Sequence, residues 1–128
     1  MESFDKAKLC GSLAQEKKAK DIVIMNLQGL TDIADYFVIA SGTSERHVKT
    51  IADSIEAGMK DHGLKPFSLE GHSDARWVII DYQSVVAHIF LDQLRELYDL
   101  ESLWIEAEKY RIQNEKQSAG VENEKKGT

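Results

Sequence analysis

The chain has 128 residues, of which 42% are hydrophobic and 30% are charged, with a formal net charge of −6. This length is sufficient for one domain with its own core, and the composition is that of an ordinary globular protein. Residues 106–128 contain five acidic and five basic side chains, so the whole negative excess lies on residues 1–105. Because binding to nucleic acid depends on basic clusters, the charge argues against direct, sequence-specific contact with nucleic acid and favours a basic protein partner.

Three features indicate the compartment. Cys10 is the single cysteine, which excludes an internal disulfide and is compatible with a reducing environment. No apolar run reaches the roughly 18 residues that a membrane helix needs, and residues 1–5 lack the basic and apolar regions of a signal peptide. We therefore expect a cytoplasmic protein with no membrane partner.

The first forty residues predict a helix followed by two strands. Leu9 and Leu13 lie four residues apart, which is the spacing of one helical face, and short apolar runs then indicate strands. The expected elements are a helix over 3–18 and strands over 21–27 and 35–41.

The next helix is the best defined by the sequence. Ser44 or Thr43 caps its first amides, and Gly63 ends it. Gly58 lowers its helix propensity by about 1 kcal/mol relative to alanine, so this glycine either permits close packing or weakens the helix. One apolar stripe contains Val48, Ile51, Ala52, Ile55 and Met59.

The second half predicts three strands and a short helix. Pro66 restricts the first of these strands to an edge of the sheet, and a turn near Tyr82-Gln83 joins the other two. Asp92 is the expected cap of the short helix. The expected elements are strands over 65–70, 77–81 and 84–91 and a helix over 92–97.

This order predicts an α/β fold with a mixed sheet of about five strands and flanking helices. A strand, a helix and a strand in succession indicate a crossover between parallel strands, whereas the hairpins require antiparallel pairs. After residue 105 charged and small residues predominate. We therefore expect one domain over 1–105 and a charged, flexible C-terminal tail over 106–128.

Ser41–Ser44 is a candidate anion site, because a turn between a strand and a helix presents free amides. The same residues are equally those of a capping turn. A nucleotidyltransferase also has such a turn in a small mixed sheet, but its chemistry needs carboxylates that converge on metal ions, and no Asp-x-Asp pair follows here. Four scattered histidines indicate no metal site. We expect no catalytic residue, no metal ligand and no cofactor.

The segment from Trp77 to Trp104 is rich in aromatic and arginine side chains, which dominate the binding energy of protein interfaces. Trp77 is either a core aromatic or, since Asp81 shares its face, an exposed one; His88 is either a hydrogen-bonded sheet residue or a partner contact. Arg95 and Tyr98 share one helical face, as an ion pair with a packed ring or as a binding surface. The candidate partner-binding residues are Trp77, Asp81, His88, Arg95, Tyr98 and Leu100.

Several short motifs follow one another over residues 3–105. They are Asp35-Tyr36-Phe37-Val38, Ser41-Gly42-Thr43-Ser44 with Arg46, Gly71, Trp77, Asp81-Tyr82, His88-Ile89-Phe90, Arg95 and Tyr98-Asp99-Leu100-Glu101-Ser102-Leu103-Trp104. In this order and spacing the chain resembles the ribosomal silencing factors of the Iojap type (RsfS family). It departs from them at Gln83-Ser84, where the family often has Gly-Asp; a glycine adopts positive φ freely and a glutamine does so at a cost.

The resemblance implies a nucleotidyltransferase-like fold without catalytic carboxylates. It further implies a translation repressor that binds the large ribosomal subunit through ribosomal protein uL14 and blocks joining with the small subunit. Members of such a family also self-associate, which leaves a monomer and a homodimer open. The alternative is a vestigial nucleotidyltransferase-like protein that binds nucleotide at Ser41–Ser44.

Overall fold

The structure is a computed structural model that describes residues 1–112 and the backbone of residues 121–124. Within these residues, helices and strands alternate around one sheet. The elements are α1 (Ser3–Glu16), β1 (Lys20–Asn26), β2 (Tyr36–Gly42), α2 (Glu45–Asp61), β3 (Ser68–Glu70), β4 (Trp77–Asp81), β5 (Val85–Leu91), α3 (Asp92–Tyr98), α4 (Leu100–Leu103), β6 (Glu108–Ile112) and β7 (Val121–Glu124).

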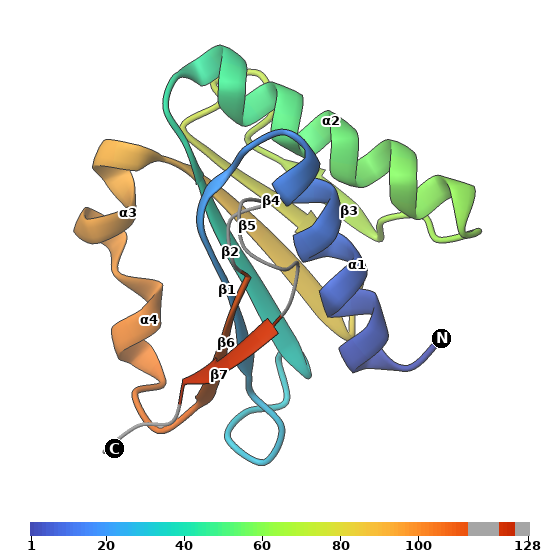
Figure 1. The fold of residues 1–128 in the computed structure, drawn as a ribbon, viewed down its shortest axis with the longest axis vertical. Helices are drawn as coiled ribbons and strands as arrows, with labels where there is room; N and C mark the ends of the chain where they lie inside the picture. Colours follow the sequence, from blue (N-terminus) through green and yellow to red (C-terminus); the bar gives the residue numbers. More distant parts are fainter. Residues whose placement is uncertain (113–120, 125–128) are drawn as a thin grey trace.

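The sheet is mixed and has the strand order β3-β4-β5-β2-β1-β6-β7. Helices α1 and α2 lie on one face and the short helices α3 and α4 lie on the other (Figure 1). The predicted α/β class and mixed sheet are confirmed, with seven strands in place of about five. None of the described helices is long and apolar enough to cross a membrane.

The centre of the sheet is the parallel pair β2 and β5, and the other described pairs are antiparallel. The chain leaves β2, passes through α2, β3 and β4, and returns beside β2 as β5. The first strand after α2 is thus not the parallel partner of β2. It forms an edge instead, as Pro66 in the preceding segment predicts, because proline cannot donate a ladder hydrogen bond.

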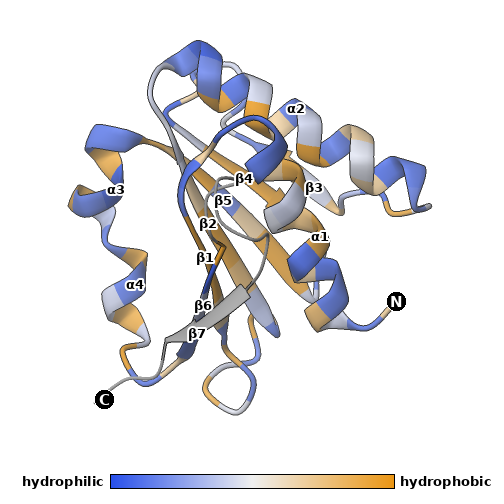
Figure 2. Ribbon diagram, viewed as in Figure 1, coloured by the Kyte–Doolittle hydropathy of each residue, from blue (hydrophilic) through white to orange (hydrophobic). Residues whose placement is uncertain are grey.

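The larger core lies between the sheet and helices α1 and α2, and Figure 2 shows the apolar strands between the helical layers. Gly58 permits close packing here, since a Cβ at this position would lie 2.3 Å from a methyl carbon of Leu13 on α1. Ser44 is the N-cap of α2, and its hydroxyl accepts a hydrogen bond from the amide of His47 at 3.1 Å. The expected stripe of five apolar residues on α2 is fully buried.

The hairpin of β4 and β5 forms in the expected place, and Gln83 in its turn adopts the positive φ that a glycine would adopt freely. This residue has φ +70°, and its amide donates to the carboxylate of Asp81 at 2.7 Å. Positive φ is unfavourable for a side chain other than glycine. The hydrogen bond that Asp81 accepts from Gln83 therefore stabilises a turn conformation that a glutamine disfavours.

The C-terminal segment differs from the expectation of a tail without regular structure from residue 106. Residues 108–112 form β6, which pairs with β1, and Ala107 is buried. Tyr110 and Ile112 pack against the larger core, and Ile112 reaches the surface of α1 at Gly11. The alternation of these two apolar residues with charged ones is a strand signal that the high overall charge obscures. Residues 113–120 and 125–128 of the expected tail lie outside the described residues.

We expect removal of residues 107–128 to lower the free energy of unfolding by more than about 2 kcal/mol, because it exposes one side of β1 and removes buried apolar area. Chemical denaturation measures this. A chain ending at residue 112 keeps β6 and separates its contribution from that of the residues after it. Equal stability of the full chain and the chain ending at residue 106 would contradict the packing described for β6.

Candidate functional site

The second face of the sheet carries a group of rings that we call the aromatic face. It consists of side chains from β2, β4, β5 and the segment of α3 and α4: Phe37, Trp77, His88, Phe90, Tyr98 and Trp104. On β4 the side chains of this face are half-buried, whereas those of the opposite face are buried. The helices over this face therefore leave its β4 side accessible.

Trp77 is the centre of the aromatic face. Its ring stacks on Phe90 with 4.9 Å between centroids and contacts the ring of Tyr98 at 4.7 Å. Phe90 is fully buried, Trp77 is half-buried and Tyr98 is 49% exposed. The three rings form a gradient from core to surface, so Trp77 is neither the core residue nor the fully exposed residue of the two sequence-based alternatives.

His88 lies beneath Trp77 and is 6% exposed. Its Nδ1 accepts a hydrogen bond from the indole N–H of Trp77 at 3.1 Å, which places the imidazole proton on Nε2. Burial lowers the pKa of His88 from 6.5 to about 4. The side chain is therefore neutral near pH 7, and its Nε2 is buried without a hydrogen-bond partner among the described residues.

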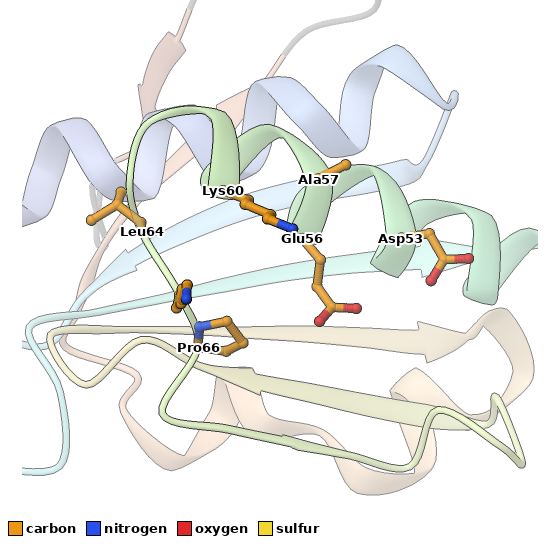
Figure 3. Close-up of a pocket in the computed structure, with 7 residues that line it drawn as sticks. Asp53, Glu56, Ala57, Lys60, Leu64 and Pro66 are labelled. Atoms are coloured by element: carbon orange, nitrogen blue, oxygen red, sulfur yellow. The ribbon is translucent and has the colours of Figure 1, made fainter.

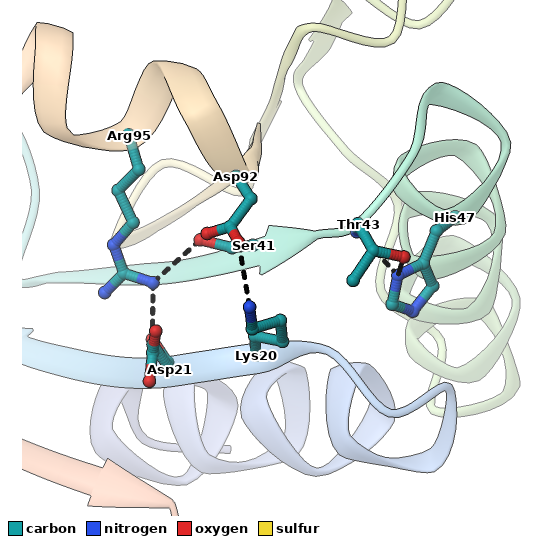
Figure 4. Close-up of polar contacts among 7 residues, drawn as sticks. All are labelled: Lys20, Asp21, Ser41, Thr43, His47, Asp92 and Arg95. Carbon is teal, nitrogen blue, oxygen red and sulfur yellow. Dashed lines mark hydrogen bonds and ion pairs between the residues drawn. The ribbon is translucent and has the colours of Figure 1, made fainter.

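Arg95 does not face a partner in this structure, because it is 9% exposed and its guanidinium is used within the chain (Figure 4). Its Nη1 donates to the carbonyl of Asp21 at 2.6 Å and to the hydroxyl of Ser41 at 3.0 Å. Its Nε and Nη2 donate to the two carboxylate oxygens of Glu101 at 3.2 and 3.3 Å. The expectation of an exposed arginine is corrected: the side chain ties α3 and α4 to β1 and β2.

The remaining candidate residues lie at different places on this face. Leu100 is half-buried and packs against the core beneath α4. Asp81 ends β4 and supports the hairpin turn, roughly 13 Å along the strand from Trp77 at 3.3 Å per residue. The structure thus brings Trp77, His88 and Tyr98 together and leaves Asp81 apart from them.

Exposed apolar side chains on and after α3 were missed by the sequence reasoning. Leu97 is 72% exposed, Leu103 is 65% exposed and Ile105 is 54% exposed. The sequence did not indicate which leucines would face solvent, because α3 and α4 are too short to show a helical hydrophobic period. Exposed apolar side chains on the short helices that cover the second face make these helices candidates for part of an interaction surface.

The Ser41–Ser44 turn is the capping turn of the two alternatives. Ser41 is buried against Arg95, and the amide of Thr43 donates to Nδ1 of His47 at 2.9 Å (Figure 4). The Nε2 of the same histidine in turn donates to the carbonyl of Lys17 at 2.7 Å, which joins the end of α1 to the start of α2. The hydroxyls of Ser41 and Ser44 and the amide of Thr43 are thus each hydrogen-bonded within the chain.

The described residues also form hollows outside the aromatic face. An open groove of about 470 Å³ runs between α2 and the segment before β3, and Asp53, Glu56 and Lys60 point toward it (Figure 3). A smaller hollow of about 290 Å³ beside α3 is lined by five carboxylates and two guanidinium groups: Asp21, Asp92, Glu96, Asp99, Glu101, Arg95 and Arg111. Among the described residues, no group of three or more His, Cys, Asp or Glu is placed to hold a metal ion.

One family model matches the whole chain. The model of the family described as "ribosomal silencing factor during starvation" matches residues 1–128. The ribosomal silencing factor RsfS of Halalkalibacterium halodurans is 37% identical over 107 residues, which are 84% of this chain and 92% of that protein. The protein of the same name from Bacillus subtilis is 36% identical over 78% of this chain and 85% of its own length.

Two solved structures have the same fold. A Chromobacterium violaceum protein superposes with a TM-score of 0.79 at 35% identity, over 81% of this chain and 87% of its own. A Bacillus halodurans protein gives a TM-score of 0.70 at 37% identity, over 76% of this chain and 90% of its own. The mixed sheet described above is therefore the fold of these relatives.

We expect Arg95→Ala to lower the free energy of unfolding by about 3 kcal/mol, because it leaves the buried Ser41 hydroxyl and the Asp21 carbonyl without their donor and removes the ion pair with the partly buried Glu101. Arg76→Ala is the matched control, since Arg76 is 68% exposed and lies 4.0 Å from Glu45, and an exposed pair contributes about 0–1 kcal/mol. Urea denaturation measures both. Equal losses for the two variants would contradict the role of Arg95 described here.

We expect the stability of the wild type to fall between pH 6.5 and pH 4 relative to His88→Leu. The unfolded chain binds a proton at His88 near pH 6.5, whereas the folded chain binds it only near pH 4. Between these values the unfolded state binds more protons, so the stability increases with pH, by about 3 kcal/mol over the whole interval. Denaturation curves at several pH values measure the difference, and parallel pH profiles of the two proteins would contradict it.

Proposed function

The chain belongs to the ribosomal silencing factor family, and on this basis we propose that it is a translation repressor that binds the large ribosomal subunit. We further propose that it contacts ribosomal protein uL14 and sterically blocks joining with the small subunit. The relatives support the ribosomal role by name, including a mouse protein described as "mitochondrial assembly of ribosomal large subunit protein 1", which is 34% identical over 73% of this chain and 42% of its own length.

The single observation that carries the proposal is the accessible aromatic face beside the exposed leucines of α3 and α4. Trp77 and Tyr98 are in contact and partly accessible, and Leu97 on α3 and Leu103 on α4 are exposed apolar side chains. Aromatic side chains held in a fixed arrangement supply most of the binding energy of protein interfaces at a small loss of conformational entropy. These features support the proposal that this surface binds a protein partner.

The acidic side chains beside α3 support the proposal of a basic partner for the second face of the sheet. The hollow beside α3 contains five carboxylates and two guanidinium groups. Arg95 is already paired with Glu101, so the remaining charge there is negative. Such a surface attracts a basic protein and repels a phosphate backbone. We propose that the chain works in the cytoplasm, on ribosomal protein and not by direct binding to RNA.

The proposed mechanism requires no reacting group. A protein seated on the subunit-joining face of the large subunit excludes the small subunit by its volume, so its effect depends on occupancy alone. The turn at Ser41–Ser44 has internal partners, as described above, and this supports the proposal that the chain acts without nucleotide and without catalysis.

We expect Leu97→Ser and Tyr98→Ala each to weaken binding to purified large subunits by about tenfold or more, as truncation of interface anchors does. Phe67→Ser is the matched control, because Phe67 is 73% exposed and Leu97 is 72% exposed, but Phe67 precedes the edge strand β3. Co-sedimentation with large subunits measures the affinity, and subunit-joining assays measure the repression. Leu97→Ser and Phe67→Ser replace largely exposed side chains and should each change stability by no more than about 0.5 kcal/mol.

Two results would contradict the proposal. The first is a sedimentation profile of mixed subunits that excess wild-type protein leaves unchanged. The second is a loss of binding in Phe67→Ser as large as that in Leu97→Ser, which would show that the contact is not centred on α3.

A further inference from the structure

The presence of a histidine at position 88 is not explained by a contribution to the stability of the fold. His88 is 94% buried by area, its pKa is lowered by desolvation, and its Nε2 has no hydrogen-bond partner in the described part of the chain. A buried polar atom without a partner destabilises the folded state, whereas an apolar side chain of similar shape avoids this penalty. The neighbours of His88 on this face are apolar or aromatic, and they would accommodate a leucine.

The polar contact that His88 does make is directed at Trp77. Trp77 is opposite Phe90 in the antiparallel pair, and His88 is its diagonal neighbour on the same face. The indole N–H donates to Nδ1 of His88 at 3.1 Å. The imidazole itself is held by the ring of Phe37 at 4.5 Å, so the acceptor has a fixed position.

We propose that His88 is a positioning residue of the interface, and that its Nδ1 holds the indole of Trp77 in the orientation that meets the partner. The inference rests on the proposed function, since it concerns the same surface. Stacking on Phe90 fixes the plane of the indole but not which edge faces the core, because the outer torsion of an aromatic side chain has broad wells. A directional hydrogen bond selects one of them.

The benefit of this arrangement is preorganisation. Trp77 is half-buried, and Tyr98, whose ring contacts it at 4.7 Å, is itself 49% exposed, so the hydrogen bond to His88 adds a directional constraint that ring contacts do not supply. An anchor that is already oriented loses less entropy when the partner binds. His88 therefore raises affinity while it lowers the stability of the free chain, and these opposite effects distinguish positioning from ordinary core packing.

The experiment uses three single variants and one double variant of the full chain, with Trp104→Phe to assign the NMR signal. His88→Leu removes the acceptor, His88→Asn restores an acceptor oxygen near the place of Nδ1, and Trp77→Phe removes the donor. Melting temperature and affinity for purified large subunits are measured for each variant and for Trp77→Phe combined with His88→Leu. The indole N–H of Trp77, distinguished from that of Trp104 by Trp104→Phe, is followed by NMR without ribosomes.

We expect His88→Leu to melt at or above the wild-type temperature and to bind large subunits about tenfold more weakly, with His88→Asn close to the wild type. The indole N–H should shift and exchange faster with solvent in His88→Leu and stay protected in His88→Asn. Once Trp77 is phenylalanine, His88→Leu should have little further effect on affinity, because the bond is already absent.

Three results would overturn the inference. They are wild-type affinity in His88→Leu, a loss of affinity that only follows a loss of melting temperature, and additive effects in the double variant. Absence of binding by the wild-type protein would instead overturn the proposed function and, with it, this inference. Normal wild-type binding together with normal binding of His88→Leu would overturn the inference alone.

Discussion

The positions of α3 and α4 on the second face of the sheet depend on the hydrogen bonds of the Arg95 guanidinium. Helix α3 has seven residues and α4 has four, and helices of this length are not stable by themselves in water. Their positions must come from contacts with the rest of the molecule. Arg95 supplies them by joining the carboxylate of Glu101 on α4 to the backbone of β1 and the hydroxyl of Ser41 on β2.

The backbone of β1 is shaped to receive this contact. Asp21 has φ +51°, and the register between β1 and β2 shifts between Lys20 and Val23. An irregularity of this kind releases a carbonyl from the strand ladder, and the carbonyl of Asp21 accepts from Arg95 at 2.6 Å. Lys20 adds an ion pair of 2.8 Å with Asp92 at the start of α3. The irregularity in β1 thus provides the backbone carbonyl through which Arg95 joins α3 and α4 to the sheet.

The two faces of the sheet are consequently covered by helices to different extents. The long helices α1 and α2 close the first face, where the amphipathic stripe of α2 is fully buried. On the second face the short helices leave Trp77 half-buried and Tyr98 and Leu97 exposed. The same shortness that makes α3 and α4 depend on Arg95 leaves apolar surface available to a partner, so the architecture of this face and its proposed use have one cause.

The sequence by itself determined the elements whose signal is local. The stripe of α2, its cap at Ser44, the β4–β5 hairpin with its strained Gln83 and the edge position enforced by Pro66 all follow from spacing and backbone chemistry within a few residues. Trp77 and Tyr98 were likewise identifiable as interface candidates by residue type. Their direct contact could not be read from the sequence, because it joins residues 21 positions apart.

Only the tertiary structure decided which polar residues are used inside the molecule. Arg95 looks like a surface arginine in the sequence, and its burial depends on Asp21, 74 residues away. The strand β6 was not predicted, since its charged residues gave no clear apolar pattern. Its pairing with β1 involves a strand from the other end of the chain, which local sequence cannot reveal. His88 had two sequence-based interpretations, and its bond to Trp77 became visible only when two strands were paired in one register. A residue's neighbours along the chain set its propensity, but contacts between distant residues set its burial and its hydrogen-bond partners.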